Sequence, residues 1–439
     1  MKVGTTVRPD VEPWPGAAQA WFVVAALSVA SLFSFLDRTV ISLLVQPIKT
    51  DLLLSDTEIG VLQGAAFGVF YTLMIIPFGW VADHGNRIRL VFCGMIVWSL
   101  MTAACGLATN FWEMFAARVG IGIGEATLAA SAASIIADHF PAARRTLPLS
   151  VYTLVASAGV GVGLVGGAII ATTLADVGTL TVPVLGTLQM WQLVFIAVGL
   201  PGLGWALVLL TMREPARREN TGDDATWGEL FDFVKLRRRV IGLHFFGYCF
   251  YNTFGYGAGG WLPVFFMREY GWGIAEVGTR YGILYLIMPV VGGVACGWVV
   301  RKLMERGRVD ANLYAIAINN TLMTVPGVLT PLMPNGWLAL VMVTPLIAIF
   351  VFPSGASLAA IQEITPNRLR GRMTALYYAV TNLVGISLGT VFIGALTDYV
   401  FRDEMRVGDS IALAAVLLCP LGGAIMFLAA RARRTLAAA

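Results

Sequence analysis

Charged residues are scarce in this 439-residue chain. Asp, Glu, Lys and Arg together make up 13% of it, whereas a soluble globular protein carries about 25%. Hydrophobic residues make up 57%, and the mean hydropathy is +0.76. This balance suits a chain that lies in lipid. The net charge of +4 is small and needs no nucleic acid to explain it, so we expect no nucleic-acid partner.

Histidine and cysteine are too few and too scattered to indicate a metal or redox site. The three histidines, His84, His139 and His244, lie far apart in the sequence. The five cysteines all fall inside apolar runs without metal-ligand or redox-pair spacing, as expected of small buried hydrophobes. The sequence also lacks a nucleophile with an adjacent base. We therefore expect no metal, no cofactor and no enzymatic activity.

Twelve long apolar runs divide the chain, and about 20 mainly apolar residues are needed to cross a bilayer as a helix. The predicted spans are residues 20–46, 58–82, 89–108, 111–137, 147–172, 189–212, 240–267, 274–300, 311–332, 337–361, 373–398 and 410–430. The short alternating segments of a membrane β-barrel are not seen. The pattern predicts an all-α membrane protein with twelve transmembrane helices.

The tails and loops indicate the orientation of these spans. Residues 1–19 lack the apolar core and cleavage site of a signal peptide. Most of the 30 Lys and Arg residues fall in the tails and in the loops that follow even-numbered spans. Loops on the cytoplasmic side are enriched in Lys and Arg. We therefore expect a multi-pass protein of the bacterial inner membrane, with cytoplasmic tails at residues 1–19 and 431–439.

A long polar stretch, residues 213–239, separates the first six spans from the last six. We predict that it is a cytoplasmic loop between bundles at residues 20–212 and 240–430. A pattern recurs across it at an offset of 225: Asp138, Pro141, Arg145 and Tyr152 match Glu363, Pro366, Arg370 and Tyr377. Duplicated halves related by an axis along the membrane normal are typical of transporters that rock about a central site. We expect two six-helix, pseudo-symmetric bundles.

Four charged residues stand out within the predicted spans, where lipid disfavours them. Asp37 and Arg38 are in the first span, and Arg118 and Glu125 are in the fourth. Arg118 and Glu125 are two helical turns apart, so both project from one face. The depth of each residue along its helix places Asp37 between these two charges and within pairing reach of Arg118. We interpret the four residues as a functional cluster; a static ion pair that fixes helix packing is the alternative.

The second half lacks these charges. At the offset of 225, the positions of Asp37, Arg118 and Glu125 are taken by Leu262, Val343 and Phe350. The seventh span is instead rich in aromatic residues, and we assign three of them, Tyr251, Phe254 and Tyr256, to a substrate-binding wall. A cavity with one charged wall and one aromatic wall suits an amphipathic cargo. Ordinary core packing is the alternative interpretation of the aromatic residues.

The loop between the second and third spans, Gly79 to Arg87, resembles the signature loop of the major facilitator superfamily. Gly79, Asp83 and Arg87 match it, whereas His84 and Asn86 depart from it. Asp83 is placed to pair with Arg87 or Arg145. We expect a cytoplasmic gate whose charge contacts form in one conformation and break in the other, built from Asp83, Arg87, Asp138, Arg145, Glu363 and Arg370.

Within that superfamily, three motifs resemble the Spinster family, whose members transport sphingosine phosphate and lysophospholipids. They are Phe35-Leu36-Asp37-Arg38, Arg118 with Gly122-Ile123-Gly124-Glu125-Ala126, and Asp83-x-x-Asn86-Arg87. Bacterial symporters for sugar acids carry similar elements, but Asn86 and the aromatic seventh span favour Spinster. The resemblance implies that Asp37 and Glu125 are proton-coupled acids. It also implies that Arg38 contacts an anionic headgroup or one of these acids, and that Arg118 organises the network.

We therefore expect a monomeric, proton-coupled transporter that works by alternating access. Its partners are protons, membrane lipids and a small amphipathic or anionic substrate such as a lysolipid or sphingoid phosphate. Two other functions remain open. One is a proton-coupled symporter of small organic anions such as sugar acids, with the arginines as carboxylate clamps. The other is a non-transporting membrane receptor or scaffold.

Overall fold

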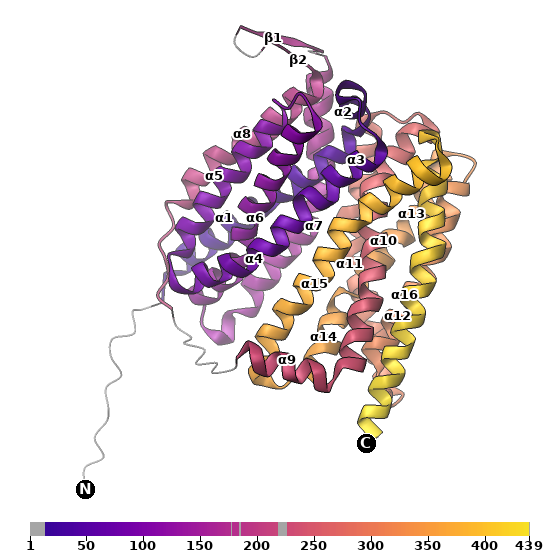
Figure 1. Ribbon diagram of the computed structural model, residues 1–439. Helices are drawn as coiled ribbons and strands as arrows, with labels where there is room; N and C mark the ends of the chain where they lie inside the picture. Colours follow the sequence, from indigo (N-terminus) through magenta and orange to yellow (C-terminus); the bar gives the residue numbers. More distant parts are fainter. Residues whose placement is uncertain (1–13, 177, 184–185, 218–225, 439) are drawn as a thin grey trace.

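The structure is a computed structural model that describes residues 14–176, 178–183, 186–217 and 226–438. Residues 1–13 of the predicted N-terminal tail and 218–225 of the predicted central loop lie outside the described residues. The described chain is a bundle of long helices in which the first helix begins and the last helix ends toward the same side (Figure 1). We call this the terminal side and the opposite one the far side.

The first group of helices precedes residue 210. Its members are α1 (Ala17–Leu43), α2 (Val45–Leu52), α3 (Asp56–Gly60), the π-helical turn η1 (Val61–Ala65), α4 (Ala66–His84), α5 (Arg87–Cys105), α6 (Phe111–His139), the 3-10 turn η2 (Ala142–Arg144), α7 (Thr146–Ala175) and α8 (Met190–Leu209). The elements α3, η1 and α4 follow one another without a break and together cross the bundle. Strands β1 (Leu180–Val182) and β2 (Gly186–Leu188) form an antiparallel hairpin on the far side (Figure 1).

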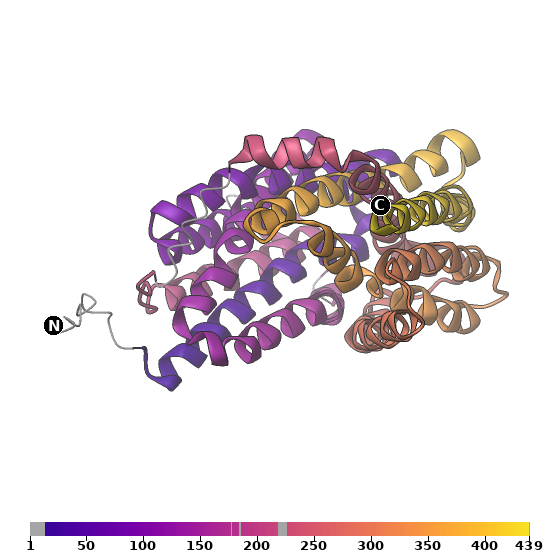
Figure 2. The same cartoon turned by 90° about the horizontal axis from the view of Figure 1, so that it is seen from below.

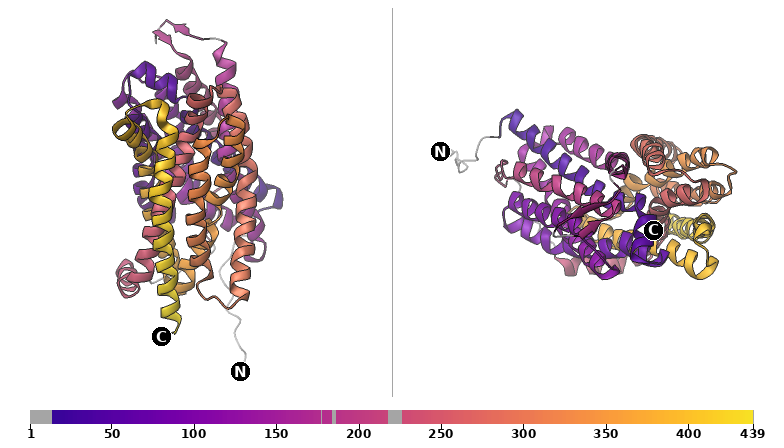
Figure 3. Two further views of the ribbon diagram at one scale, coloured as in Figure 1. Left: turned by 90° about the vertical axis from the view of Figure 1, so that its right-hand side faces the viewer. Right: turned by 90° about the horizontal axis from the view of Figure 1, so that it is seen from above.

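The second group follows a short surface helix, α9 (Trp227–Leu236). Its members are α10 (Arg238–Tyr270), α11 (Ile274–Glu305), α12 (Ala311–Leu329), the 3-10 turn η3 (Thr330–Leu332), α13 (Gly336–Val351), α14 (Ser354–Ile364), the 3-10 turn η4 (Asn367–Leu369), α15 (Arg370–Ala395), the π-helical turn η5 (Leu396–Phe401), the 3-10 turn η6 (Glu404–Arg406) and α16 (Val407–Ala438). Views from below and above show the two groups side by side (Figures 2 and 3).

The described residues contain eleven helical segments that are long and apolar enough to cross a membrane. The twelfth is α10, which has 33 residues but a less apolar composition because it includes buried polar residues such as His244 and Asn252. The predicted class, twelve transmembrane helices in two bundles, is confirmed. The helix ends differ in places: α10 begins at Arg238, and α16 continues to Ala438. The predicted tenth span is divided into α13 and α14 at Pro353, which has no amide hydrogen to continue the helix.

The two groups meet on the far side, where α15 lies against α3, η1 and α4. Small residues make this approach possible. A Cβ atom on Gly60 would lie 2.6 Å from the Thr390 carbonyl oxygen, and one on Gly64 would lie 2.3 Å from Thr390 Oγ1. The Thr390 hydroxyl also donates to the Gly60 carbonyl oxygen at 2.7 Å. These contacts close the space between the groups on the far side.

Inside the first group, glycines of α7 lie against α1, and substituting one of them is expected to lower stability. A Cβ atom on Gly163 would lie 2.3 Å from Thr39 Oγ1 and 2.9 Å from the backbone oxygen of Phe35. Because that backbone oxygen cannot rotate away, we expect Gly163→Ala to destabilise the fold by about 1–3 kcal/mol. The midpoint of thermal unfolding in detergent measures this effect.

Gly166 on the same helix is the matched control. A Cβ atom there would meet only Leu36 Cδ1, at 3.7 Å, so Gly166→Ala is expected to raise the unfolding midpoint slightly, since alanine is favoured over glycine within a helix. Equal changes at the two positions would contradict the close approach of α7 to α1.

Candidate functional site

The structure joins α1 to α6 through an ion pair. Arg38 contacts Glu125 Oε2 through Nε at 2.6 Å and through a terminal guanidinium nitrogen at 2.5 Å. The Ser34 hydroxyl, one turn earlier on α1, donates to the same oxygen at 2.6 Å. Glu125 is buried, and its Oε1 has no hydrogen-bond partner among the described residues. The Glu125 carboxylate is therefore held on one side and unpaired on the other.

The Arg118 side chain is fully buried. Its Nε donates to the Leu62 carbonyl oxygen at 3.0 Å, and a terminal nitrogen donates to the backbone oxygen of Asp37 at 3.2 Å. The expected approach of Asp37 to Arg118 is therefore found, but it runs through the main chain. The Asp37 side chain is also buried, and its Oδ1 has no hydrogen-bond partner within the described part of the chain.

Leu62 can accept from Arg118 because it lies in the π-helical turn η1. A π-helical turn widens the helix and leaves carbonyl groups without their regular partners, and such turns are frequent at functional sites. The Arg118 guanidinium satisfies one of these carbonyls. Arg118 thus fixes the position of η1 relative to α1 and α6.

Aromatic rings surround the Arg38 guanidinium. Its Cζ lies 4.5 Å from the ring centroid of Phe67, 4.7 Å from that of Tyr71 and 5.3 Å from that of Phe35. Rings at these distances stabilise a cation through their negative faces. The Arg38 side chain remains 22% exposed, whereas that of Glu125 is 0% exposed. Arg38 is therefore the member of the ion pair that faces open space.

That space is a cavity of about 300 Å³ between the two groups. The first group contributes Phe35, Arg38, Thr39, Ser42, Gln63, Phe67, Tyr71, Arg118 and Val160, and the second contributes Gly255, Tyr256, Gly259, Gly260, Tyr285, Phe350, Asn382, Ile386 and Thr390. The described lining residues include two arginines and no carboxylate. The second group supplies mainly aromatic, apolar and glycine positions.

The three seventh-span aromatics assigned to the substrate-binding wall do not all face the cavity. Tyr256 lines the cavity, but Tyr251 and Phe254 do not. Tyr251 is buried and donates from its hydroxyl to the backbone oxygens of Ile349 and Phe350. Phe254 is buried beside Gly327 of α12. Phe350, the counterpart of Glu125 at the offset of 225, lines the cavity instead.

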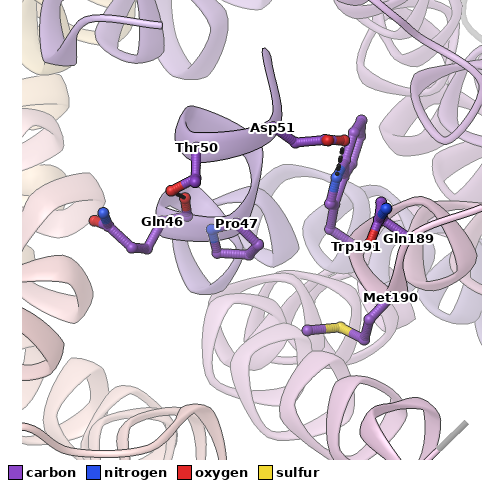
Figure 4. Close-up of a pocket in the computed structure, with 7 residues that line it drawn as sticks. All are labelled: Gln46, Pro47, Thr50, Asp51, Gln189, Met190 and Trp191. Atoms are coloured by element: carbon purple, nitrogen blue, oxygen red, sulfur yellow. Dashed lines mark hydrogen bonds between the residues drawn. The ribbon is translucent and has the colours of Figure 1, made fainter. Parts of the chain in front are cut away.

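A larger hollow of about 480 Å³ lies on the far side of the first group (Figure 4). It is bounded by residues of α2 and of the start of α8. The Trp191 indole nitrogen donates to Asp51 Oδ2 at 2.9 Å across it. None of the predicted site residues lines this hollow, and only one group forms it. The smaller cavity between the groups is therefore the candidate functional site.

The predicted gate residues on the terminal side form pairs within each group. Arg87 contacts Asp138 at 2.5 Å and Glu214 at 2.7 Å. In the second group, Asn312 Nδ2 donates to Glu363 Oε1 at 2.6 Å. The offset of 225 relates Arg87 to Asn312 and Asp138 to Glu363, so the same helix junction is closed by an ion pair in one group and by a hydrogen bond in the other.

The other predicted gate residues are not part of these two pairs. Asp83 is exposed and, among the described residues, pairs with neither Arg87 nor Arg145. Arg370 donates to the backbone oxygens of Gln362 and Thr365 within its own group. Arg145 lies at the start of α7. Glu214 was not singled out in the sequence, although it directly follows the sixth span in Arg213-Glu214-Pro215.

Removing Arg87 is expected to destabilise the protein. Its side chain is 3% exposed, and its loss leaves Asp138 and Glu214 close together without a cation. Breaking a buried pair by removing one partner costs about 3–5 kcal/mol, so Arg87→Ala is expected to lower the thermal unfolding midpoint clearly. Arg89→Ala, at an exposed position two residues later, is the control and should change little. Similar midpoints for the two variants would contradict this role of Arg87.

Ion pairs that join the first group to the second are found, among the described residues, on the far side. Asp56 at the start of α3 contacts Lys49 at 2.8 Å and Arg268 at 2.7 Å, and Lys49 also contacts Glu404 at 2.5 Å. Asp398 accepts from the backbone nitrogen and hydroxyl of Thr57, both at 2.6 Å. The sequence does not reveal this cluster, because its members come from short segments far apart in the chain.

Two six-helix groups that enclose a charged cavity, closed between them on one side, have the architecture of a membrane transporter. The family model of the Major Facilitator Superfamily matches residues 27–390, and the chain belongs to this family.

Named relatives are transporters. The chain is 29% identical over 424 residues to an MFS-type efflux pump of Mycolicibacterium smegmatis, covering 95% of this chain and 94% of that protein. It is 27% identical over 300 residues to a probable L-galactonate transporter of Escherichia coli, covering 63% and 61%. It is 31% identical over 180 residues to protein spinster homolog 1 of Xenopus tropicalis, covering 40% and 34%.

A solved structure supports the same placement. The crystal structure of a bacterial homolog to the human lysosomal transporter Spinster, in an inward-facing and unoccupied conformation, superposes with a TM-score of 0.83. The two chains are 25% identical, and the match covers 96% of this chain and 99% of that one. The resemblance to the Spinster family seen in the motifs is therefore confirmed over the whole fold.

Proposed function

We propose that this protein is a proton-coupled secondary transporter that moves an anionic amphiphile, such as a lysolipid or a sphingoid phosphate, by alternating access. Both termini lie in the cytoplasm of a bacterium whose inner membrane holds the protein. The terminal side is then the cytoplasmic side, and the far side faces outward. Because ion pairs join the two groups on the far side, the described conformation is inward-facing.

The composition of the cavity lining carries this proposal. Arg38 and Arg118 are the only charged side chains among the described lining residues. Because the lining contains these two cations and no carboxylate, it favours a ligand with a negatively charged group. The opposite wall, with Tyr256, Tyr285 and Phe350, favours an apolar portion next to that group. Ligand cavities usually measure about 300–1,000 Å³, so about 300 Å³ accommodates a headgroup and the start of a chain.

Proton coupling follows from the position of Glu125 behind Arg38. An anionic cargo and the Glu125 carboxylate compete for the same guanidinium. When Glu125 takes up a proton, its hold on Arg38 weakens, and the cargo anion is favoured. Asp37 is a second acid in the same cluster, with a side-chain oxygen that has no partner among the described residues. A difference of a few kcal/mol between two conformations is sufficient to shift their populations.

A binding and transport screen tests the proposal. The purified full chain is titrated with a lysophospholipid, a sphingoid phosphate and a sugar acid at two pH values, and uptake into proteoliposomes is then driven by a proton gradient. We expect saturable binding of the two lipids that strengthens with acyl-chain length, together with gradient-dependent flux. Binding without flux would indicate the receptor function, and absence of both would contradict the proposal.

The second candidate is a proton-coupled symporter of small organic anions. The pair of arginines in the cavity and the similarity to a probable L-galactonate transporter support it. An arginine guanidinium binds a carboxylate through two parallel hydrogen bonds. Competition separates the candidates, because a cavity for a small polar anion should bind the sugar acid and be insensitive to the length of an acyl chain.

A further inference from the structure

A patch of aromatic rings and cations lies on the terminal side, away from the cavity and the far-side ion pairs. Its aromatic members are Trp227 and Phe231 of α9, which are 43% and 49% exposed and whose ring centroids lie 6.3 Å apart. Its cations are three successive arginines at the junction of α9 with α10, and none of them has an ion pair among the described residues. They are Arg237, Arg238 and Arg239. We call these five residues the α9 patch.

The position of α9 sets the depth of this patch in a membrane. Only Arg237 separates α9 from α10, which crosses the bilayer, and Arg238 and Arg239 are exposed in the first turn of α10. α9 runs across the terminal side at a steep angle to the long helices (Figure 1), and it lies at the margin of the bundle when seen from below (Figure 2). The α9 patch therefore lies at the level where a lipid leaflet meets water.

The two flanks of α9 face different surroundings. Leu230 is fully buried and holds the helix against the protein. Glu229 pairs with Arg368 of the second group at 3.2 Å, so the flank that carries Glu229 faces that group. At about 100° per residue, Trp227 and Phe231 each lie about 200° around the helix from Glu229. The two rings therefore occupy the opposite flank, which faces away from the second group.

The chemistry of the α9 patch matches a leaflet surface with anionic headgroups. Amphipathic helices that lie in a membrane interface carry aromatic residues toward the lipid and cations beside them. Clusters of Lys and Arg next to the cytoplasmic end of a transmembrane helix attract anionic lipids, and each cation contributes about 5-fold in affinity. The acids of α9 are already paired, Glu229 with Arg368 and Asp232 with Lys235 at 3.3 Å. The charge of the three arginines therefore remains available.

We infer that the α9 patch binds the headgroups of anionic phospholipids. The rings of Trp227 and Phe231 enter the leaflet between neighbouring lipids, and the arginines contact the phosphates. A zwitterionic lipid accommodates the rings equally well but carries no net charge, so the arginines favour a lipid such as phosphatidylglycerol. The inference goes beyond the proposed function and does not depend on the transported substrate, because it requires only that α10 crosses a membrane.

Native mass spectrometry of the purified full chain measures the affinity. The protein in detergent is titrated with phosphatidylglycerol and with phosphatidylcholine of the same acyl chains. A variant with Arg237→Gln, Arg238→Gln and Arg239→Gln is expected to bind its tightest phosphatidylglycerol about 100-fold more weakly, about 5-fold for each arginine lost, with unchanged affinity for phosphatidylcholine. The matched control removes three exposed arginines that are dispersed over other terminal-side junctions, and it should keep both affinities. Its substitutions are Arg89→Gln, Arg144→Gln and Arg306→Gln.

Nitroxide labels measure whether the outward flank of α9 enters the leaflet. Phe231→Cys and Asp232→Cys are labelled separately in a background where the exposed Cys93 is replaced by Ser, and the protein is reconstituted with phosphatidylglycerol. Collision rates are then compared for oxygen, which concentrates in lipid, and for a water-soluble nickel complex. A label at position 231 is expected to collide more with oxygen, and a label at position 232 more with the nickel complex, because Asp232 is 78% exposed on a different face.

The outcomes separate the patch from net charge. Equal weakening of phosphatidylglycerol binding in the cluster variant and in the dispersed control would overturn the inference, since overall charge would then explain the preference. A label at position 231 that collides mainly with the nickel complex would also overturn it. Weaker binding in the cluster variant alone, together with a lipid-exposed label at position 231, supports it. Neither measurement involves substrate or a proton gradient, so failure of the proposed function would leave these results unchanged.

Discussion

Glu125→Gln is expected to uncouple transport from the proton gradient. The variant keeps the shape of the side chain and one oxygen for Ser34 and Arg38, but it cannot gain or lose a proton. Gradient-driven accumulation should fall about 5- to 150-fold, the span of typical coupling free energies, and its pH dependence should be lost. Exchange of substrate across the membrane without a gradient should continue, because the two groups can still move and Arg38 still faces the cavity.

Proteoliposomes loaded with substrate measure both activities in the same preparation. Glu113→Gln is the matched control, since Glu113 is an exposed carboxylate at the start of the same helix. It should leave accumulation and its pH dependence unchanged. If Glu125→Gln accumulated substrate like the wild type over the same pH range, Glu125 would not be the coupling residue.

The arrangement of this site was predictable where it depends on helix geometry. Long apolar runs place the helices, and the spacing of seven between Arg118 and Glu125 puts both on the inward face of α6. Depth along a helix does not, however, determine which atoms meet. Arg118 contacts the backbone of Asp37 and the Leu62 carbonyl, and the second contact depends on a π-helical turn that has no recognisable sequence pattern.

The aromatic seventh span shows a second limit. At 100° per residue, Phe254 points to nearly the opposite side of α10 from Tyr256, and Tyr251 also lies well away from it. An aromatic run without a clear period therefore does not reveal which members face a cavity. The residues that do face it together with Tyr256 are glycines, Gly255, Gly259 and Gly260, whose only sequence signal is that they allow a neighbour to approach.

The duplicated halves were predicted from four matched positions, and the structure adds a fifth correspondence at the same offset. Arg87 pairs with Asp138, and Asn312 pairs with Glu363. Replacement of a charged donor by an amide keeps the contact but removes its charge. The offset thus predicts which helix junctions correspond. Whether a junction is closed by an ion pair or by a hydrogen bond is seen only in the side-chain contacts.

Asp56→Asn is expected to open the far side. Asp56 is fully buried and accepts from Arg268 through both carboxylate oxygens and from Lys49. Removing one partner of a buried pair is unfavourable by about 3–5 kcal/mol. Arg268 contacts Asp56 only when the two groups are joined on the far side. The substitution therefore destabilises the conformation that is closed on the far side. The equilibrium should shift toward a far-side-open conformation by about two to four orders of magnitude.

Thr50 and Tyr399 are exposed on the far side of different groups. Spin labels at these two positions, in a background where the exposed Cys93 is replaced by Ser, report the opening as a longer distance in double electron–electron resonance. The Asp56→Asn variant should convert a minor long-distance population into the main one. Glu269→Gln is the control, since Glu269 is an exposed acid beside Arg268 without an ion pair among the described residues. Unchanged distances in Asp56→Asn would contradict the role of this ion pair. The glycine contacts of α15 with η1 would then be sufficient to close the far side, and Gly64→Leu should open it.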